Sequence, residues 1–553
     1  MDKETARVLL TNFVSKIHKD LWTGVFRCDG LLSEQEVDSL VFALAAIGGQ
    51  AKFPGSEDQH VQKVQPYPLN LDANARSKPD SEDVLMCLDF GTAMSKAACI
   101  RSSNETLIDI ELGKAVGAAD TEYGLHSSMF IGRDGIVHFG PNAISASLDE
   151  GGDRKRIDSI KQYLSQGRLG DLSRRMIEPA ANPTAVPFSQ ADAIQLYLAY
   201  LTDIACTELA RNDVGRYVIR RFARPCWEGD RAQWVDDELK KLLARAQLLA
   251  DTLHGKWTSG LKLAQIKATL EQVYQLDILP TYLIDGGVPE PVASALSRIQ
   301  GDELERGMFI VVDVGAGTTD LAAFWVIQDE GKGERKIWQI GHSIDAIPQA
   351  GDTIDGYLQN EILMVAHLQP GHPDYPFAST QLSLQIRQLK ESLFRSGSVE
   401  AHLSNGTVVP IQLSSFLTTP AIRGFEDLLA KHLNQLLSKI SPSWIERIAS
   451  YRRLGKDEIT LVFSGGGSAL PMVQNLGSGY FERGKIKLEK KLAPSVPEWI
   501  LNNYPRLANS YPQLAVAIGG GERDLPKVVD SLESIPSPGP ARPGYEPATI
   551  YKR

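Results

Sequence analysis

The chain has 553 residues, and at this length roughly two to four packed units are the usual outcome, because a single core stops growing well below this size. Hydrophobic residues make up 43% and charged residues 23% of the sequence, which is typical of a globular protein. The formal net charge of -10 argues against a surface that follows the phosphates of DNA or RNA. We therefore expect no nucleic-acid partner.

The first fifty residues are predicted to form a helical extension. Apolar residues recur at three- and four-residue spacing between Ala6 and Leu21, as on one face of a helix. A second helix is expected to begin at Ser33, which forms a capping-box pattern with Glu36. The following residues, up to Asp83, are polar and rich in proline and glycine, so they are expected to form a linker.

The cysteines and the hydropathy pattern bear on the cellular setting. The five cysteines are scattered without a CxxC pair, so neither a disulfide framework nor a zinc site is expected. The N-terminus lacks the apolar centre of a signal peptide, and no run of about eighteen apolar residues occurs. We expect a soluble, cytoplasmic protein without a membrane span.

Three glycine-rich turns follow apolar segments: LDFGTAMS, which contains Asp89 and Gly91, VDVGAGTTD, which contains Asp313, and FSGGGSALP. Without a Cβ atom, glycine lets consecutive backbone N–H groups approach phosphate oxygens closely. A strand-end aspartate is repelled by phosphate, so it is expected to act through a divalent cation and its waters. One such turn alone would be interpreted as a tight turn whose aspartate bonds its own backbone. Their repetition predicts a two-sided phosphate clamp with Mg²⁺.

These turns resemble, in order, the first phosphate, second phosphate and adenosine motifs of the actin and DnaK-type chaperone ATPase superfamily. The resemblance implies an α/β fold of two lobes, related by duplication of a ribonuclease-H-like domain, that close over ATP or ADP and Mg²⁺. The DnaK-type nucleotide-binding domain is the closer relative. The predicted organisation is a helical N-terminal extension (1–50), a linker (51–83), ATPase lobe I (84–300), ATPase lobe II (301–500), a helix returning to lobe I (501–521) and a proline-rich tail (522–553).

The DnaK-type resemblance also implies further site residues. RIDSIKQYL resembles the segment of the catalytic lysine, which falls on Lys161, and VPEPVASAL that of the water-positioning glutamate, which falls on Glu290. AGDTIDGYL places Gly351 near the phosphates, and QIRQLKESL resembles an adenosine-contacting helix with Lys390. The expected set is, for catalysis, Lys161, Glu290, Asp313 and Asp320, for the metal, Asp89 and Asp313, and for the nucleotide, Gly91, Thr92, Ala93, Lys96, Gly315, Ala316, Gly317, Thr318, Gly351, Lys390, Gly465, Gly466 and Gly467.

The chain also departs from the DnaK pattern. Ala469 stands where the chaperones usually place an arginine against the base, and Arg387 and Glu391 change the charges of the adenosine helix. Lys96 matches actin, where the lysine contacts phosphate, and not the DnaK-type proteins. About thirty residues follow Gly521, too few for the peptide-binding β-sandwich of those chaperones.

The leading hypothesis is a slow DnaK-like ATPase, in which nucleotide-driven lobe closure controls a partner or client protein through the N-terminal helices or the tail. The alternative is an actin-like filament or scaffold ATPase, which Lys96 favours and the chaperone-like segments disfavour. A small-molecule kinase would need a base for a substrate hydroxyl, for which no signature is present. A pseudo-ATPase that only binds nucleotide is disfavoured by the intact acidic residues.

Overall fold

The described part of the N-terminal unit includes one short pair of antiparallel strands. The chain divides into two units, Met1–Gln65 and Pro66–Arg553. In the first unit, β1 (Ile17–Lys19) pairs antiparallel with β2 (Phe26–Cys28). The predicted first helix is wrong at Ile17, which lies in a strand ladder, and the other residues of the two predicted helices fall outside the described part. The computed structural model describes residues 17–19, 26–28, 64–151, 154–226, 230–298, 307–328, 335–450 and 458–531.

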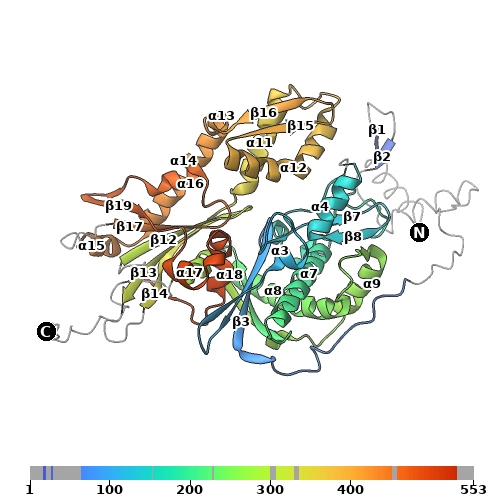
Figure 1. Ribbon diagram of the computed structural model, residues 1–553, viewed down its shortest axis with the longest axis horizontal. Helices are drawn as coiled ribbons and strands as arrows, with labels where there is room; N and C mark the ends of the chain where they lie inside the picture. Colours follow the sequence, from blue (N-terminus) through green and yellow to red (C-terminus); the bar gives the residue numbers. More distant parts are fainter. Residues whose placement is uncertain are drawn as a thin grey trace, which may run out of the picture. The chain divides into compact units, whose positions relative to one another are not determined.

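The first large sheet of the second unit forms the centre of lobe I (Figure 1). Its strands are, in sheet order, β11 (Ile284–Pro289), β9 (Val218–Arg224), β3 (Ser81–Asp89), β4 (Met94–Arg101) and β5 (Thr106–Asp109), with β6 (Leu125–His126) paired to β4. Residues Val84 to Asp89 of β3 are all buried, as expected for a strand covered on both faces. Met86 packs into the core of lobe I, whereas Cys87 faces a second core shared with lobe II.

Two long helices, α7 (Gln190–Arg211) and α8 (Asp230–Leu253), pack against each other in lobe I. Helix α7 begins at a capping box, because the Ser189 hydroxyl accepts the N–H of Asp192 and the Asp192 carboxylate accepts the N–H of Ser189. The lobe is completed by α3 (Leu112–Ala115), α4 (Gly140–Asp149), α5 (Gln162–Gln166), α6 (Leu169–Leu172), α9 (Leu263–Tyr274), η1 (Thr281–Leu283), β7 (Met129–Ile131), β8 (Ile136–Phe139) and β10 (Leu261–Lys262).

The second large sheet forms the centre of lobe II. Its strands are, in sheet order, β18 (Tyr480–Arg483), β19 (Ile486–Leu492), β17 (Glu458–Ser464), β12 (Gly307–Val314), β13 (Thr319–Gln328), β14 (Arg335–Ile347) and β20 (Lys527–Val529). The other elements are α11 (Gly351–Val365), α12 (Tyr375–Ser396), β15 (Ser398–His402), β16 (Val408–Gln412), α13 (Leu413–Leu417), α14 (Pro420–Lys439), α15 (Pro442–Ser450), α16 (Pro471–Gln474) and η3 (Asn475–Gly477). Helix α14 buries Ile422, Phe425 and Leu429, which share one helical face.

The two sheets contain the same strand order. In lobe I the order β5-β4-β3-β9-β11 is antiparallel up to β3 and parallel beyond it. In lobe II the order β14-β13-β12-β17-β19 follows the same rule. The central strands therefore bring Asp89 and Asp313 to equivalent positions, at the carboxyl ends where α/β sheets bind ligands. The mixed α/β architecture of the prediction is confirmed.

Two helices cross between the lobes, α10 (Glu290–Leu296) and α18 (Tyr511–Gly520). A Cβ atom at Gly519 would lie 1.8 Å from the carbonyl oxygen of Ala293, so this crossing requires glycine. Helix α18 also packs on β4, and the helices α17 (Glu498–Asn503) and η4 (Pro505–Leu507) precede it. Figure 1 shows α18 between the two sheets.

Residues 66–80 form a strap across lobe I, where the sequence predicted a linker. The Tyr67 N–H donates to Thr269 Oγ1 at 2.9 Å, and the Asn70 N–H to Thr252 Oγ1 at 3.0 Å. Ala73 is fully buried. The linker prediction is therefore wrong for this part, because side chains of α8 and α9 satisfy the backbone that the local composition leaves unpaired.

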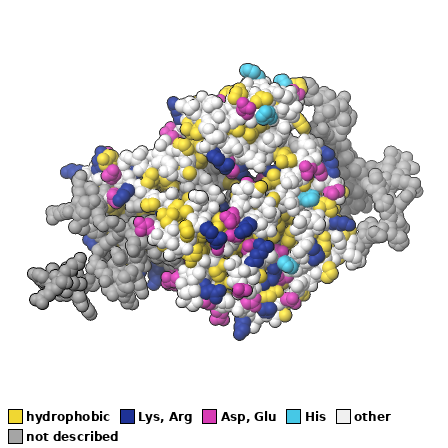
Figure 2. Space-filling view, viewed as in Figure 1, with side chains coloured by type: hydrophobic (Ala, Val, Ile, Leu, Met, Phe, Trp, Pro, Cys, Tyr) yellow, Lys and Arg dark blue, Asp and Glu magenta, His cyan; other side chains and the backbone are white. Residues whose placement is uncertain are grey.

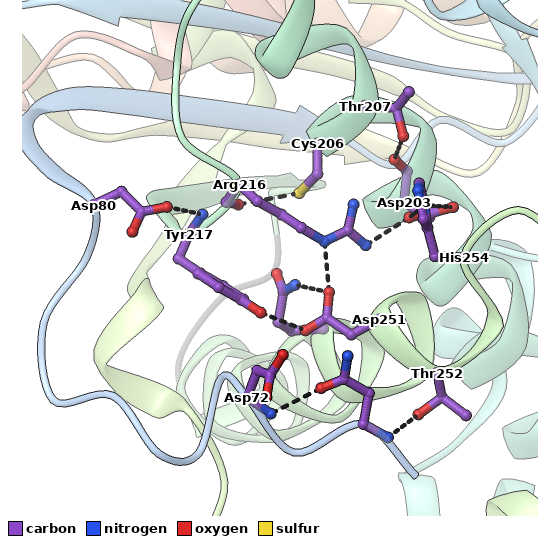
Figure 3. Close-up of polar contacts among 12 residues, drawn as sticks. Asp72, Asp80, Asp203, Cys206, Thr207, Arg216, Tyr217, Asp251, Thr252 and His254 are labelled. Atoms are coloured by element: carbon purple, nitrogen blue, oxygen red, sulfur yellow. Dashed lines mark hydrogen bonds and ion pairs between the residues drawn. The ribbon is translucent and has the colours of Figure 1, made fainter. Parts of the chain in front are cut away.

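A polar cluster lies beside the strap, and we call it the anchor cluster (Figure 3). Arg216 donates to Asp203 and to Asp251, both at 2.5 Å. The two carboxylates, each only 2–3% exposed as side chains, receive further hydrogen bonds. Its members are Asp203, Asp251, Arg216, Tyr217, His254 and Trp257.

The C-terminal segment adds a strand where the sequence predicted a proline-rich tail. Arg221 of lobe I donates to the carbonyl oxygen of Glu522, and β20 then pairs in parallel with β14 of lobe II, Lys527 opposite Trp338. The tail prediction is therefore wrong for Lys527–Val529, because the edge of β14 offers unpaired backbone groups. Residues 532–553 lie outside the described part.

The described surface has no large field of one charge on the face drawn in Figure 2, where basic and acidic side chains are interspersed. Among the described residues, no helix is long and apolar enough to cross a membrane.

Candidate active site

The first and second glycine turns contact each other where the two lobes meet. The first turn follows β3, and the Gly91 N–H donates to the carbonyl oxygen of Asp89 at 3.0 Å. The second follows β12, and the Gly315 N–H donates to the carbonyl oxygen of Thr318 at 3.0 Å. A Cβ atom at Gly317 would lie 2.7 Å from Thr92 Oγ1. The two predicted halves of the phosphate clamp therefore lie in contact.

The third glycine turn and the start of α11 pack on the second turn. The Gly467 N–H donates to the carbonyl oxygen of Val314 at 2.9 Å, and Gly465 has a φ angle of 82°, which favours glycine. From α11, the Gly351 N–H donates to the carbonyl oxygen of Gly315 at 3.2 Å. The sequence motifs that lie far apart along the chain are thus brought together around the 313–318 loop.

Charged side chains gather below these turns in what we call the cleft cluster. Lys96 lies opposite Asp89 in the β3–β4 ladder, with its Nζ 3.5 Å from Asp89 Oδ2. Lys161, at the start of α5, contacts Glu290 Oε1 at the start of α10. The cluster consists of Asp89, Glu290, Asp313 and Asp320, which are 6%, 7%, 5% and 0% exposed, and of Lys96 and Lys161.

Negative charge predominates in the cleft cluster, since four carboxylates face two ammonium groups. Burial raises the pKa of Asp313 well above its usual range, and the charges of Glu290 and Asp320 add to this. Burial also raises the pKa of Glu290, to about 7, although Lys161 opposes the shift. Burial by itself would lower the pKa of Lys161, but Glu290 and Asp89 hold it above the usual value. Additional positive charge at this site would therefore stabilise the ionised carboxylates.

Two oxygens of this cluster have no hydrogen-bond partner, Asp313 Oδ1 and Asp320 Oδ2. A buried polar atom left unpaired costs about 1–3 kcal/mol, so it needs an explanation. A divalent cation fits this donor set, because it would neutralise the excess charge and occupy oxygen lone pairs. Within the described ranges no three His, Cys, Asp or Glu side chains converge on one point. A Mg²⁺ ion held by these carboxylates would therefore take most of its ligands from water or phosphate.

Cys226, two residues beyond β9, also belongs to the site, although the sequence analysis did not select it. Its N–H donates to Asp320 Oδ1 at 2.8 Å, which links the end of β9 in lobe I to β13 in lobe II. Burial raises the pKa of Asp320, and the Cys226 N–H acts in the opposite direction by stabilising the carboxylate. The position could have been found as the second residue after a buried strand of the central sheet.

A second link between the lobes, also missed from the sequence, converges on Asp352 of α11. Ser159 Oγ donates to its Oδ2 at 3.0 Å and Gln162 Nε2 donates to the same atom at 2.9 Å. Ser159 has a φ angle of 56°, a left-handed conformation that is uncommon for serine. This residue lies two positions before Lys161. The only sequence signal was position, since Ser159 and Gln162 flank the predicted lysine and Asp352 follows Gly351.

The residues predicted at the adenosine end have partners within their own lobe. Lys390 Nζ lies 2.8 Å from Asp355 Oδ1 and donates to the carbonyl oxygen of Gly351 at 3.0 Å. Arg387 Nη2 lies 3.1 Å from Asp352 Oδ1. Ala469, on the third glycine turn, is exposed. The structure thus places Lys390 beside Gly351, with its charge already paired.

Comparisons with known proteins were made for the whole chain. No protein-family model matches it. A search of curated proteins found similarity to the "Chaperone protein HscA homolog" of Methylobacillus flagellatus, at 23% identity over 421 residues. The alignment covers 74% of this chain and 56% of that protein, so the chain spans about half the length of its relative. The similarity to an HscA-type chaperone confirms the predicted resemblance of this chain to the DnaK-type members of the actin and DnaK ATPase superfamily.

Proposed function

We propose that the chain binds ATP with Mg²⁺ between its lobes and hydrolyses it slowly. The observation that carries this proposal is the cleft cluster: buried carboxylates with unpaired oxygens lie beneath two glycine turns that face each other. The excess negative charge of this cluster would by itself repel a triphosphate. A divalent cation bound to the carboxylates would offset that charge and attract the phosphate oxygens. The relative is described as a chaperone, which is consistent with an ATPase of this superfamily.

The proposed mechanism divides the work among the cleft residues. The turns that contain Gly91 and Gly315, with neighbouring hydroxyl groups, cradle the phosphates, and Asp89 and Asp313 hold hydrated Mg²⁺. When bound, the ion supplies positive charge against the phosphate oxygens. With a pKa of about 7, Glu290 can accept a proton from the attacking water near neutral pH. The nucleotide set is completed by Thr92, Ala93, Lys96, Ala316, Gly317, Thr318, Gly351, Lys390, Gly465, Gly466 and Gly467, and the catalytic set by Lys161, Asp313 and Asp320.

Hydrolysis is proposed to change the angle between the lobes. The contacts to Asp352 and from Cys226 connect lobe I with lobe II, so a nucleotide that binds both glycine turns favours the closed arrangement. The shared strand order supports an origin of the lobes by duplication of a ribonuclease-H-like domain. The output is proposed to be control of a partner or client protein, through the N-terminal segment or the tail, in the cytoplasm.

The test is ATP turnover and nucleotide binding by the full chain and by Asp313→Ala. We expect the variant to lose hydrolysis, because one of the two carboxylates assigned to Mg²⁺ is removed. Asp374→Ala is the matched control, since Asp374 is an exposed carboxylate of the same lobe outside the cleft. Turnover by Asp313→Ala equal to that of the control would contradict the assigned site, and absence of nucleotide binding by the parent chain would contradict the function.

A second candidate function is an ATP-dependent filament or scaffold. It is favoured by Lys96, which lies in the cleft beside Asp89, as the resemblance to actin implies. Electron microscopy with and without ATP separates the two functions. Polymers that disappear when ATP is removed would support the filament, whereas a dispersed ATPase in both conditions would support the partner-controlled switch.

A further inference from the structure

Ser127, the residue after β6, is hydrogen-bonded twice to the first glycine turn. Its hydroxyl donates to the carbonyl oxygen of Gly91 at 2.7 Å, and its N–H donates to the carbonyl oxygen of Ala93 at 2.9 Å. Ser127 is only 1% exposed. Both bonds therefore lie on the side of the turn that faces the interior of lobe I.

These two bonds fix the direction of the backbone donors in the turn. In a trans peptide the carbonyl group and the following N–H group point in opposite directions. The carbonyl groups of Gly91 and Ala93 point toward Ser127. The N–H groups of the residues that follow them, Thr92 and Met94, therefore point away from the interior of lobe I. They are directed to the side where the phosphates are proposed to bind.

A chain of buried hydroxyl groups stands behind Ser127. Its Oγ lies 3.1 Å from Ser95 Oγ, and the Tyr197 hydroxyl on α7 donates to the same Ser95 oxygen at 3.1 Å. Ser95 and Tyr197 are both 0% exposed, and burial raises the pKa of Tyr197, so its hydroxyl stays protonated. Since Ser127 gives its one proton to Gly91, Ser95 is the donor to Ser127. The chain thus runs in one direction, from Tyr197 to the turn.

These three hydroxyl groups have no part in the mechanism proposed above. On the basis of the proposed function, we propose that Ser127, supported by Ser95 and Tyr197, is a positioning residue that orients the first turn for phosphate before nucleotide binds. Donors that are already oriented bind an anion without the cost of ordering a loop. Because only Ser127 bonds the turn, the effect on phosphate binding decreases from Ser127 to Ser95 to Tyr197.

The experiment measures the dissociation constant of the full chain for ATP with Mg²⁺, by calorimetry. Ser127→Ala should weaken binding about tenfold, since the turn loses a buried hydrogen bond. Ser95→Ala should weaken it about threefold and Tyr197→Phe less than about twofold. Ser343→Ala is the matched control, because Ser343 is a fully buried serine of lobe II whose hydroxyl donates to the carbonyl oxygen of Ile340. This control should bind ATP as the parent does, and denaturation should show a similar loss of stability in Ser343→Ala and Ser127→Ala.

Ser127→Cys separates the hydrogen bond from the packing, because a thiol fills the space of the hydroxyl but donates weakly. We expect it to bind ATP nearly as weakly as Ser127→Ala. ATP binding equal to that of the parent by Ser127→Cys, or equal to that of the control by Ser127→Ala, overturns the inference and leaves the nucleotide-binding function standing. A loss in Tyr197→Phe larger than that in Ser95→Ala also overturns it. If the parent chain does not bind ATP, the proposed function is overturned and the inference with it.

Discussion

The cleft cluster and the anchor cluster are both buried groups of acidic and basic side chains, but they differ in balance. In the anchor cluster, Asp203 accepts from Arg216 and from His254 (Figure 3). It also accepts from Trp257 Nε1 at 2.9 Å, so its carboxylate is fully engaged. In the cleft cluster, Asp313 and Asp320 each retain an unpaired oxygen.

This difference separates a structural role from a binding role. A balanced buried network stabilises the fold once it forms, and removing one member leaves the others without partners. An unbalanced cluster lowers stability on its own and is retained where a ligand completes it. The anchor cluster joins α7 and α8 to the segment that leads into β9, whereas the cleft cluster lies where the two lobes meet. Four predictions test this contrast, from the largest expected effect to the smallest.

Lys161→Ala should reduce the turnover of ATP about 1,000-fold, since one charge that stabilises the developing phosphate charge is lost. Nucleotide affinity should weaken less than about tenfold, because the glycine turns remain. Lys155→Ala, an exposed lysine of the same lobe, is the control. Single-turnover hydrolysis and equilibrium binding give the two values. Turnover equal to the control would show that the cleft cluster is not catalytic at this position.

Asp203→Asn should lower the free energy of unfolding by about 3 kcal/mol, because Arg216 and the other partners of Asp203 lose the buried carboxylate with which they pair. Turnover per folded molecule should stay at the parent value. Chemical denaturation measures the first quantity, and Asp213→Asn, at an exposed position, provides the reference. A loss of turnover in fully folded Asp203→Asn would remove the distinction between the two clusters.

The stability of the nucleotide-free chain should fall as pH rises through the range set by Glu290. The pKa of this group is about 7 in the folded chain and 4.5 as its ordinary value, so the folded state binds its proton more tightly. Acid therefore favours folding, and between pH 4.5 and pH 7 the unfolding free energy should decrease by about 2 kcal/mol. Denaturation at several pH values checks this. Glu290→Gln should flatten the slope; an unchanged slope would exclude Glu290 as its source.

Ser159→Ala should accelerate product release about fivefold, because it removes one of the hydrogen bonds between lobe I and Asp352. The hydroxyl of Ser438 bonds within its own helix, so Ser438→Ala is a suitable control. Stopped-flow release of labelled ADP measures the rate. A rate equal to that of the control would mean that this contact does not restrain opening of the lobes.

The sequence predicted those parts of the structure that local patterns determine. The turns after Asp89 and Asp313 share one sequence pattern, an apolar segment followed by aspartate and glycine. The structure brings the two turns into contact at Gly317 and Thr92. The roles of these residues remain predictions until turnover is measured. Cys226 carried no motif, because its contribution is a backbone N–H that becomes relevant only when β9 and β13 are placed side by side.

The errors have a common physical cause. Ile17 was assigned to a helix from periodicity, which does not report strand pairing. The strap and β20 look unstructured by composition, yet each obtains its hydrogen bonds from residues far away in the chain, such as Thr269 or Trp338. Local composition measures what a segment can satisfy by itself and is silent on what a distant surface provides.

The strap also determines where this chain can be cut. A fragment that began at Val84, where the β3 strand pattern starts, would lack residues 66–80. The hydroxyl of Thr252 would lose its hydrogen bond from Asn70, and the site that buries Ala73 would be left empty. It would expose to solvent the surface of α8 and α9 that residues 66–80 cover. Limited proteolysis should therefore spare residues 66–80, and a soluble fragment of the body should start no later than Pro66.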